Sequence, residues 1–254
     1  MKCGSRRVER RQGRMACCAA IFIWGVLGLL IGTSANAQEA KSAPAKAAGS
    51  QVFTASELLG SEKWMPLREP RFSRGCPWKL DAGYLVNTAP AGASREDVKG
   101  MKDGLGLSIY GLKDPLPLKF EVSGTFQVDG DSAAGFVLNA GVEGGALTSH
   151  YVALIHHGGV NLWKYTFSDA GKDKGDYLKL GFCDRKLQPD TDYKRKIVTG
   201  FCSQNERGHG CTISLFLNDE HVLGVTDPAP FPPGVMGLWL GEGYARVKEV
   251  QTKY

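Results

Sequence analysis

The sequence has no surplus of basic charge once its first 37 residues are set aside. Lys and Arg total 31 and Asp and Glu total 26. Residues 1–37 hold six of these bases and one of these acids, which leaves 25 of each in residues 38–254. A protein that binds nucleic acid needs an excess of Lys and Arg, because binding displaces the counterions of the phosphates. We therefore expect no nucleic-acid partner.

Several short motifs of enzymes and metalloproteins are also missing. The chain has no Gly-x-Ser-x-Gly turn of the kind that carries a catalytic serine, and no Cys-x-x-Cys pair of the kind that binds zinc. Adjacent residues of a strand point to opposite faces, so His156 and His157, at the end of a predicted strand, cannot chelate one metal ion together. The sequence assigns no catalytic residue and no metal site.

Calcium is the one cofactor that the sequence leaves open. Asp129-Gly130-Asp131, or Asp173 with Asp176, offers the oxygen ligands that calcium prefers. Aspartates beside glycines also form ordinary turns, which is the alternative interpretation. We expect a domain without a cofactor.

The sequence has few segments with the periodicity of a helix, and most of its regular segments alternate apolar and polar residues. Most alternate residues from Leu118 to Val128 are apolar, which indicates a strand of an antiparallel sheet with one buried face. Thr54–Leu59 predicts a single capped helical turn. Further strands, separated by Gly, Pro, Asn and Asp, are predicted at 83–87, 106–110, 135–140, 150–157, 160–167, 194–201, 212–217, 222–225, 235–240 and 246–252. The predicted fold class is all-β, a sandwich or a barrel.

Residues 1–37 have the three parts of a secretory signal peptide. A basic stretch ends at Arg14, an apolar stretch runs over 15–31, and Ala35-Asn36-Ala37 closes the segment. We expect cleavage after Ala37 and export to the periplasm or the extracellular space. The alternative is an uncleaved membrane anchor, because the apolar stretch approaches the roughly 20 residues that span a bilayer. A membrane is a partner only in that case.

The rest of the chain is predicted to form a linker and one domain. Residues 38–52 form the flexible linker, since 38–50 are rich in Ala, Lys and Ser and contain no large apolar residue. Residues 53–254 form the β-sandwich domain, with no second linker and no long repeat. The oligomeric state is not indicated by the sequence.

Four cysteines follow the predicted signal peptide. An even number in an exported chain suggests two disulfides, for which three pairings are possible. Cys202 and Cys211 flank a polar loop between two predicted strands, so we expect the pairs Cys202–Cys211 and Cys76–Cys183. The alternative is a set of unpaired buried thiols.

The order of several weak motifs resembles a known family. They are Gly60 to Trp64, Trp78 to Leu85, the strand 118–128, Ala134 to Leu138, Tyr151 to Ile155, Leu217 to Val222, Asp227, and Pro232 to Trp239. In this order they resemble the concanavalin-A-like lectin/glucanase jelly rolls, and among these the laminin-G-like modules and the bacterial 3-keto-disaccharide hydrolase domain. The resemblance covers about residues 53–254.

The resemblance implies a two-sheet antiparallel jelly-roll sandwich and a carbohydrate ligand. Glucanases of this fold carry Glu-x-Asp-x-Glu on one strand, and no such spacing occurs here. Hydrolase-like relatives have an acid after the tyrosine of the central strand, where this chain reads Tyr151-Val152-Ala153. We therefore expect an exported glycan-binding module. The alternatives are an enzyme acting on modified disaccharides and a structural or protein-interaction domain of the cell envelope.

Candidate ligand-binding residues are aromatic and amide side chains, because a sugar has apolar C–H faces and hydroxyl edges. Trp163 and Tyr165 share one face of the strand 160–167, which is either a binding platform or part of the core. Asn139 and His156 are predicted to occupy solvent faces of neighbouring strands. The predicted ligand-binding residues are Asn139, Tyr151, His156, Trp163, Tyr165 and Trp239.

Overall fold

The computed structural model describes residues 49–69, 78–87, 107–129, 132–167, 175–205, 208–241 and 245–254. All of them belong to one compact unit, Ala45–Tyr254. The predicted signal peptide, 1–37, and most of the predicted linker, 38–52, lie outside the described residues. Within the part of the chain that is described, no helix is long and apolar enough to cross a membrane.

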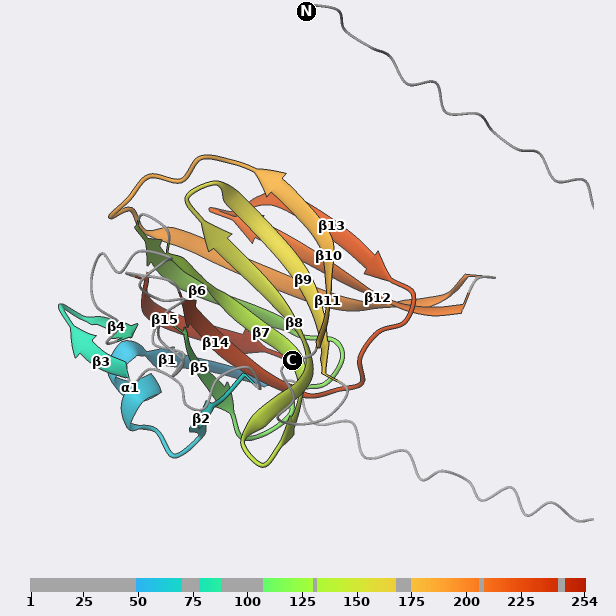
Figure 1. Ribbon diagram of the computed structural model, residues 1–254, viewed down its shortest axis with the longest axis horizontal. Coiled ribbons are helices and arrows are strands. Elements are labelled where there is room, and N and C mark those ends of the chain that lie inside the picture. Colours follow the sequence, from blue (N-terminus) through green and yellow to red (C-terminus); the bar gives the residue numbers. More distant parts are fainter. Residues whose placement is uncertain are drawn as a thin grey trace, which may run out of the picture. The chain divides into compact units, whose positions relative to one another are not determined.

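The described residues form one short helix and two antiparallel sheets (Figure 1). The helix is α1 (Ala55–Gly60). The strands are β1 (Ser50–Thr54), β2 (Trp64–Leu67), β3 (Trp78–Asp81), β4 (Tyr84–Asn87), β5 (Leu107–Leu112), β6 (Glu121–Val128), β7 (Ala133–Glu143), β8 (Ala146–His156), β9 (Gly159–Phe167), β10 (Gly175–Asp184), β11 (Tyr193–Asn205), β12 (Gly208–Leu217), β13 (Glu220–Asp227), β14 (Val235–Gly241) and β15 (Ala245–Lys253).

The two sheets have interleaved strand orders, as in a jelly roll. Sheet A has the order β13-β12-β11-β6-β15-β4-β3, with β1 also pairing with β15. Sheet B has the order β10-β9-β8-β7-β14-β5-β2. Every pairing between the strands is antiparallel. The predicted fold class, an all-β two-sheet antiparallel sandwich, is confirmed.

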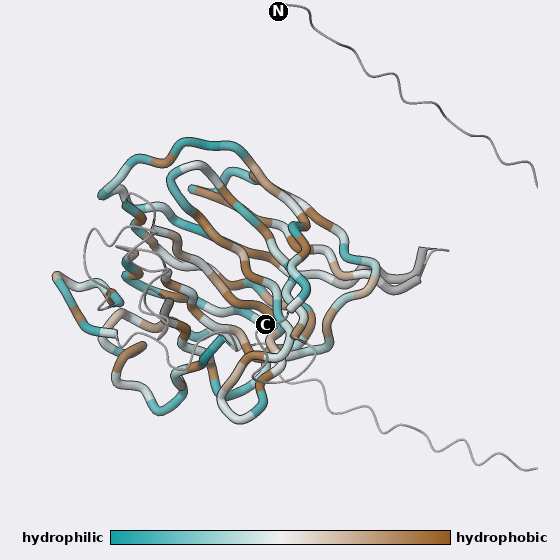
Figure 2. The backbone as a smooth tube through the Cα atoms, viewed as in Figure 1, coloured by the Kyte–Doolittle hydropathy of each residue, from teal (hydrophilic) through white to brown (hydrophobic). Residues whose placement is uncertain are grey.

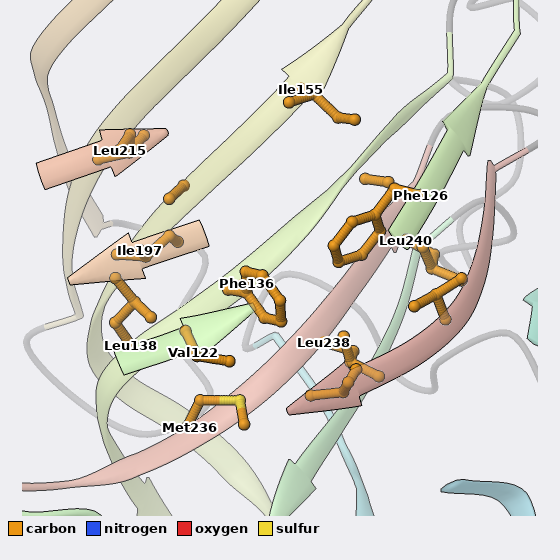
Figure 3. Packing of buried hydrophobic residues seen from close by; sticks show 14 of the residues in the cluster. Val122, Phe126, Phe136, Leu138, Ile155, Ile197, Leu215, Met236, Leu238 and Leu240 are labelled. Carbon is orange, nitrogen blue, oxygen red and sulfur yellow. The ribbon is translucent and has the colours of Figure 1, made fainter. Parts of the chain in front are cut away.

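The main core lies between the two sheets. Val122 and Phe126 of β6 meet Phe136 and Leu138 of β7 there, and the rings of Phe126 and Phe136 are in edge-to-face contact with centroids 5.1 Å apart (Figure 3). In Figure 2 the apolar, brown positions concentrate on the central strands. The predicted alternation in 118–128 is confirmed from Glu121 onward, where β6 begins.

The short helix forms where the sequence predicts it. Thr54 caps α1 through a capping box: its side chain accepts from the backbone N–H of Glu57, and the Glu57 carboxylate accepts from the backbone N–H of Thr54 at 2.8 Å. Such a box satisfies two backbone donors that a helix start leaves without partners. Ala55 and Leu58 then face the core.

The core contains a charged side chain, Arg195 of β11. It is 1% exposed, and its Nη1 donates to the Ala134 carbonyl oxygen at 3.3 Å, while Nε and Nη2 have no hydrogen-bond partner among the described residues. Burial lowers the pKa of Arg195 to about 9, so the guanidinium is still charged at neutral pH. Gly135 makes room for it, since a Cβ at Gly135 would overlap the Ala153 carbonyl oxygen and lie 2.6 Å from Arg195 Nη1.

The predicted disulfides are not found among the described residues. Cys183 is a free, half-buried thiol, and its predicted partner Cys76 lies outside the described residues. The register of β11 and β12 places Gly210, not Cys211, opposite Cys202. The prediction assumed that the two cysteines face each other across the hairpin, and a register offset by one residue removes that arrangement.

Candidate functional site

The outer side of sheet B carries two rows of residues in register. Directly opposed residues of neighbouring strands share a face of the sheet, so each row can be followed from β10 to β2. The first row is Lys179, Trp163, Val152, Val137, Gly237, Gly111 and Met65. The second row is Phe182, Asn161, Leu154, Gly135, Trp239, Ile109 and Leu67. We call this surface the aromatic face.

The aliphatic residues of the aromatic face form a second apolar cluster, separate from the core between the sheets. Val137, Val152 and Leu154 are buried in it, and Trp239 packs against it while remaining partly exposed. Gly241 leaves room for the Trp239 ring, because a Cβ there would lie 2.5 Å from it. The aliphatic side chains thus form a floor that supports the larger rings.

The rings gather over β9 and β10. Trp163 and Tyr165 are half-buried with centroids 6.4 Å apart, and Tyr165 meets Tyr177 edge to face at 4.9 Å. On its other neighbour strand Tyr165 stacks on His150, with centroids 5.1 Å apart and ring planes 12° apart. Tyr177 and Phe182 of the edge strand are 40% and 47% exposed, so the aromatic surface is open to solvent at this edge.

A polar pair lies in the same area. The Asn161 side-chain amide is 2.8 Å from His156 Nε2, and the Gly158 N–H donates to His156 Nδ1 at 3.1 Å. Burial, with the charges of His157 and Lys179, lowers the pKa of His156, so the ring is neutral at pH 7.

One end of the aromatic face is covered by the hairpin between β7 and β8. The Arg68 N–H, just after β2, donates to the Gly145 carbonyl oxygen at 3.0 Å, and the Leu147 N–H donates to the Arg68 carbonyl oxygen at 2.9 Å. Three strands separate β2 from β8 in sheet B, and Leu67 and Leu147 belong to the cluster under the aromatic face. The hairpin therefore bends across this face.

The bend begins at Asn139, which the structure places differently from the prediction. Asn139 is 3% exposed and has a positive φ of 48°, at a bulge where the register of β7 and β8 shifts between Leu138 and Gly141. Its Oδ1 has no partner among the described residues. The expectation of a solvent-facing Asn139 is wrong, because an extra residue in the strand interrupts the alternation on which it rested.

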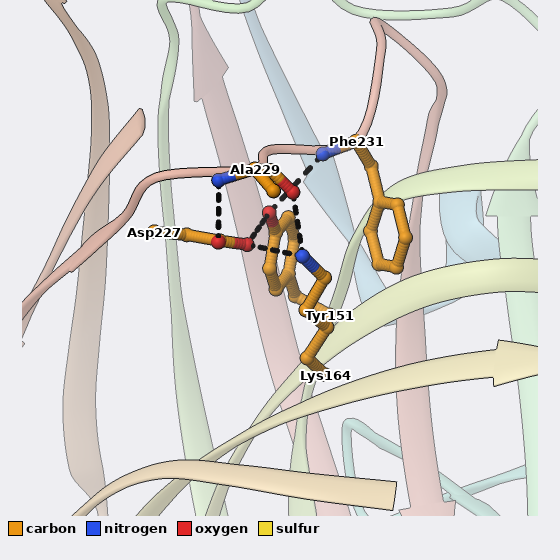
Figure 4. A network of polar contacts seen from close by, with 5 residues as sticks. All are labelled: Tyr151, Lys164, Asp227, Ala229 and Phe231. Carbon is orange, nitrogen blue, oxygen red and sulfur yellow. Dashed lines mark hydrogen bonds and ion pairs between the residues drawn. The ribbon is translucent and has the colours of Figure 1, made fainter. Parts of the chain in front are cut away.

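Tyr151 also lies elsewhere, on the core side of sheet B. It is fully buried and its hydroxyl donates to Asp227 Oδ2 at 2.6 Å and accepts from the Phe231 N–H at 3.2 Å. Lys164 Nζ lies 2.7 Å from the same Asp227 oxygen and 2.6 Å from the Ala229 carbonyl oxygen (Figure 4). This network fastens the segment between β13 and β14 to sheet B, so Tyr151 is a structural residue.

The network shifts two pKa values in opposite directions. Burial and the bond to Asp227 raise the pKa of Tyr151 far above its usual value, so it remains a donor. Burial alone would raise the pKa of Asp227, but the hydrogen bonds from Lys164, Tyr151 and the Ala229 N–H outweigh it and lower the pKa. Asp227 is therefore a carboxylate at neutral pH.

The structure thus brings four of the six predicted residues together. Trp163, Tyr165, Trp239 and His156 share the aromatic face, whereas Tyr151 and Asn139 do not take part in it. Asn161, which alternation places on the same face as Trp163, was not among the predicted ligand-binding residues, and Lys179 and Phe182 were missed because no strand was predicted at β10. The signal was present as the alternating apolar residues Leu178, Leu180 and Phe182.

Carboxylates are missing from the two rows of the aromatic face. Neither row contains Asp or Glu, and no group of His, Cys, Asp and Glu suited to a metal ion occurs among the described residues. Of the residues considered for calcium, Asp129 and Asp176 are exposed, while Asp131 and Asp173 lie outside the described residues.

A pocket of about 630 Å³ lies away from this face, on sheet A. Its lining includes Lys119, Phe120 and Tyr254, and the ion pair between Lys253 Nζ and Glu121 Oε1, 3.1 Å long, is part of its wall. None of the residues predicted from the sequence lines it. The convergence of aromatic and polar side chains makes the aromatic face the stronger candidate site.

Comparisons with known proteins agree on the fold. No protein-family model matches the chain, and no curated protein matches its sequence. Among solved structures, the carbohydrate-binding module CBM66 from Bacillus subtilis is 14% identical, with a TM-score of 0.50 over 73% of this chain and 92% of that one. A prokaryotic β-1,3-1,4-glucanase (lichenase) from a mouse hindgut metagenome is 13% identical, with a TM-score of 0.50 over 81% and 98%.

The Bacillus licheniformis β-glucanase is also similar, at 11% identity and a TM-score of 0.50 over 80% of this chain and 97% of that one. At such low identity these similarities concern the fold and not the activity. They agree with the two antiparallel sheets of seven and eight strands. The chain therefore has the concanavalin-A-like lectin/glucanase fold.

Proposed function

We propose that this protein binds a glycan on the aromatic face of sheet B. The observation that carries the proposal is the set of partly exposed rings, Trp163, Tyr165 and Trp239, held on a buried aliphatic floor beside the His156–Asn161 pair. The C–H faces of a pyranose stack on such rings, and polar groups at their edges bond to its hydroxyls. The floor fixes the rings before a ligand arrives, which lowers the entropic cost of binding.

The similar structures support a carbohydrate ligand. One is a carbohydrate-binding module and two are glucanases, and each spans nearly its whole length on this chain. The signal-like segment at 1–37 supports the further proposal that the protein acts outside the cytoplasm, in the periplasm or beyond.

The lining of the aromatic face favours binding over hydrolysis. A retaining glycosidase places two carboxylates about 5–5.5 Å apart across the scissile bond. On the aromatic face, β8 instead presents Val152, Leu154 and His156 at alternate positions, and neither of the two rows carries an acid. A binding role needs no such pair.

Replacing Trp163 with alanine is expected to weaken glycan binding about thirtyfold, because a central aromatic contact is worth about 2 kcal/mol. The ligand is first found on a glycan array, and affinities are then measured by isothermal titration calorimetry. Tyr84→Ala is the matched control, since Tyr84 is a partly exposed aromatic residue of sheet A.

The Tyr84→Ala variant should bind with unchanged affinity. If the wild-type protein binds no glycan on the array, the proposed function is wrong. If it binds and Trp163→Ala binds equally well, the ligand lies elsewhere than on the aromatic face.

A further inference from the structure

A lysine, Lys179, lies at the open edge of the aromatic face. Lys179 is exposed on β10, directly opposite Trp163 in the register, and its Nζ lies 4.9 Å from the centroid of the Trp163 ring. The same Nζ lies 5.6 Å from the centroid of the Phe182 ring. No carboxylate of the described residues lies within ion-pair distance of it.

No described acid forms an ion pair that would compensate the charge of Lys179. The two rows of the aromatic face carry no acid, and the charge of Lys179 contributes to the lowered pKa of His156 on the same surface. On β10 itself the acids are Asp176 and Asp184, at either end of the strand and both exposed, and Asp184 lies on the aromatic face in the row of Gly159 and His156. The middle of the strand, where the rings are, is therefore positive.

The position of the charge relative to the rings matters for a sugar. The Lys179 ammonium lies over the Trp163 ring, so a sugar residue that replaces it on this ring would have the displaced ammonium at its rim. An ammonium at such a rim forms a charge-assisted hydrogen bond with an anionic substituent, which is stronger than one with a neutral hydroxyl. A neutral ligand would instead have to desolvate the ammonium without replacing its counterion.

We propose that the ligand is an anionic glycan, whose sugar stacks on Trp163 while its carboxylate or sulfate group pairs with Lys179. This inference rests on the proposed function and names its ligand class. Lys179 then makes the site prefer an anionic sugar over a neutral one, and the rings contribute affinity for both.

The test compares each ligand that carries an anionic group with its counterpart that has a neutral group in that place. Galacturonate oligosaccharides are compared with their carboxyl-reduced forms, and a sulfated galactan with its desulfated form. The full chain is used as wild type, Lys179→Met and Lys179→Arg, with Lys79→Met as the control, since Lys79 is an exposed lysine of β3 in sheet A. Affinities are measured by calorimetry at two salt concentrations.

At least one charged ligand should bind the wild type about tenfold more tightly than its neutral counterpart, and salt should weaken its binding. Lys179→Met should remove this preference, and Lys179→Arg and Lys79→Met should keep it. The pair that shows the preference identifies whether the group is a carboxylate or a sulfate.

Some results would reject the anionic ligand alone, and one would reject glycan binding as well. Equal binding of charged and neutral ligands by the wild type, or an unchanged preference in Lys179→Met, rejects the anionic ligand and keeps glycan binding. The anionic ligand is also rejected, and glycan binding kept, if none of the four ligands binds and only neutral glycans bind on the array. An array without any binding rejects the proposed function as well.

Discussion

Replacing Asp227 with alanine is expected to destabilise the folded domain by about 3–5 kcal/mol, because removing one partner leaves a buried charge uncompensated. The side chains of Asp227 and Lys164 are only 5% and 15% exposed, and the carboxylate also accepts from Tyr151 and from the Ala229 N–H. The substitution would leave both Lys164 and the Tyr151 hydroxyl without this acceptor. Urea unfolding should show a lower midpoint with an unchanged m-value.

An exposed ion pair provides the control for this prediction. Glu220 and Arg185 lie 2.8 Å apart, with side chains 61% and 40% exposed. Such surface pairs are worth about 0–1 kcal/mol, so Glu220→Ala should change the midpoint little. If Asp227→Ala is no more destabilising than Glu220→Ala, the network does not hold the β13–β14 segment.

The same carboxylate makes stability depend on pH. Because the pKa of Asp227 is lowered in the folded state, the unfolded chain binds more protons as the pH falls, and stability falls with it. The contribution is complete above the ordinary pKa of an aspartate and is lost as the pH drops through the folded pKa. Unfolding curves measured from pH 7 down to pH 3 should show a smaller loss for Asp227→Asn than for the wild type. An identical loss in both proteins would contradict this assignment.

Replacing Arg195 with methionine is expected to stabilise the domain, by about 1–4 kcal/mol. Buried charges that are exchanged for apolar side chains of similar volume often give such gains. Within the described part of the chain, Arg195 has one hydrogen bond, to the Ala134 carbonyl oxygen, to offset the cost of its burial. Methionine has the unbranched shape needed to fill the same space between the sheets. Thermal and urea unfolding measure the change.

Lys194→Met, the neighbouring position on β11, is the control. The Lys194 side chain is 58% exposed, so the substitution should change stability by no more than about 0.5 kcal/mol. A loss of stability in Arg195→Met would show that the buried guanidinium stabilises the folded protein, and would contradict this prediction.

The parts of the fold that follow local rules could be predicted from the sequence. The alternation that ends at Val128 marks β6, and the Thr54–Glu57 box marks α1. Alternation also places Trp163 and Tyr165 on one face of β9. What it does not decide is which face meets the other sheet, because that depends on pairings between distant strands.

Tyr151 illustrates this limit. Tyr151 and His156 are five residues apart in β8, so alternation alone puts them on opposite faces, and only the packing of sheet A on sheet B shows that Tyr151 is on the inside. Bulges set a second limit. The bulges at Asn139 and between Lys179 and Gly181 shift the alternation by one residue, and they could not be predicted from the sequence alone.

The most direct test of glycan binding on the aromatic face uses the tryptophan indole N–H signals in an NMR titration with the glycan identified on the array. Trp163 and Trp239 lie on the aromatic face, whereas Trp64 and Trp78 are 5% and 6% exposed in the core and serve as internal controls. We expect saturable shifts of the Trp163 and Trp239 signals while those of Trp64 and Trp78 stay in place. Saturable binding that leaves Trp163 and Trp239 unmoved would contradict the proposed site.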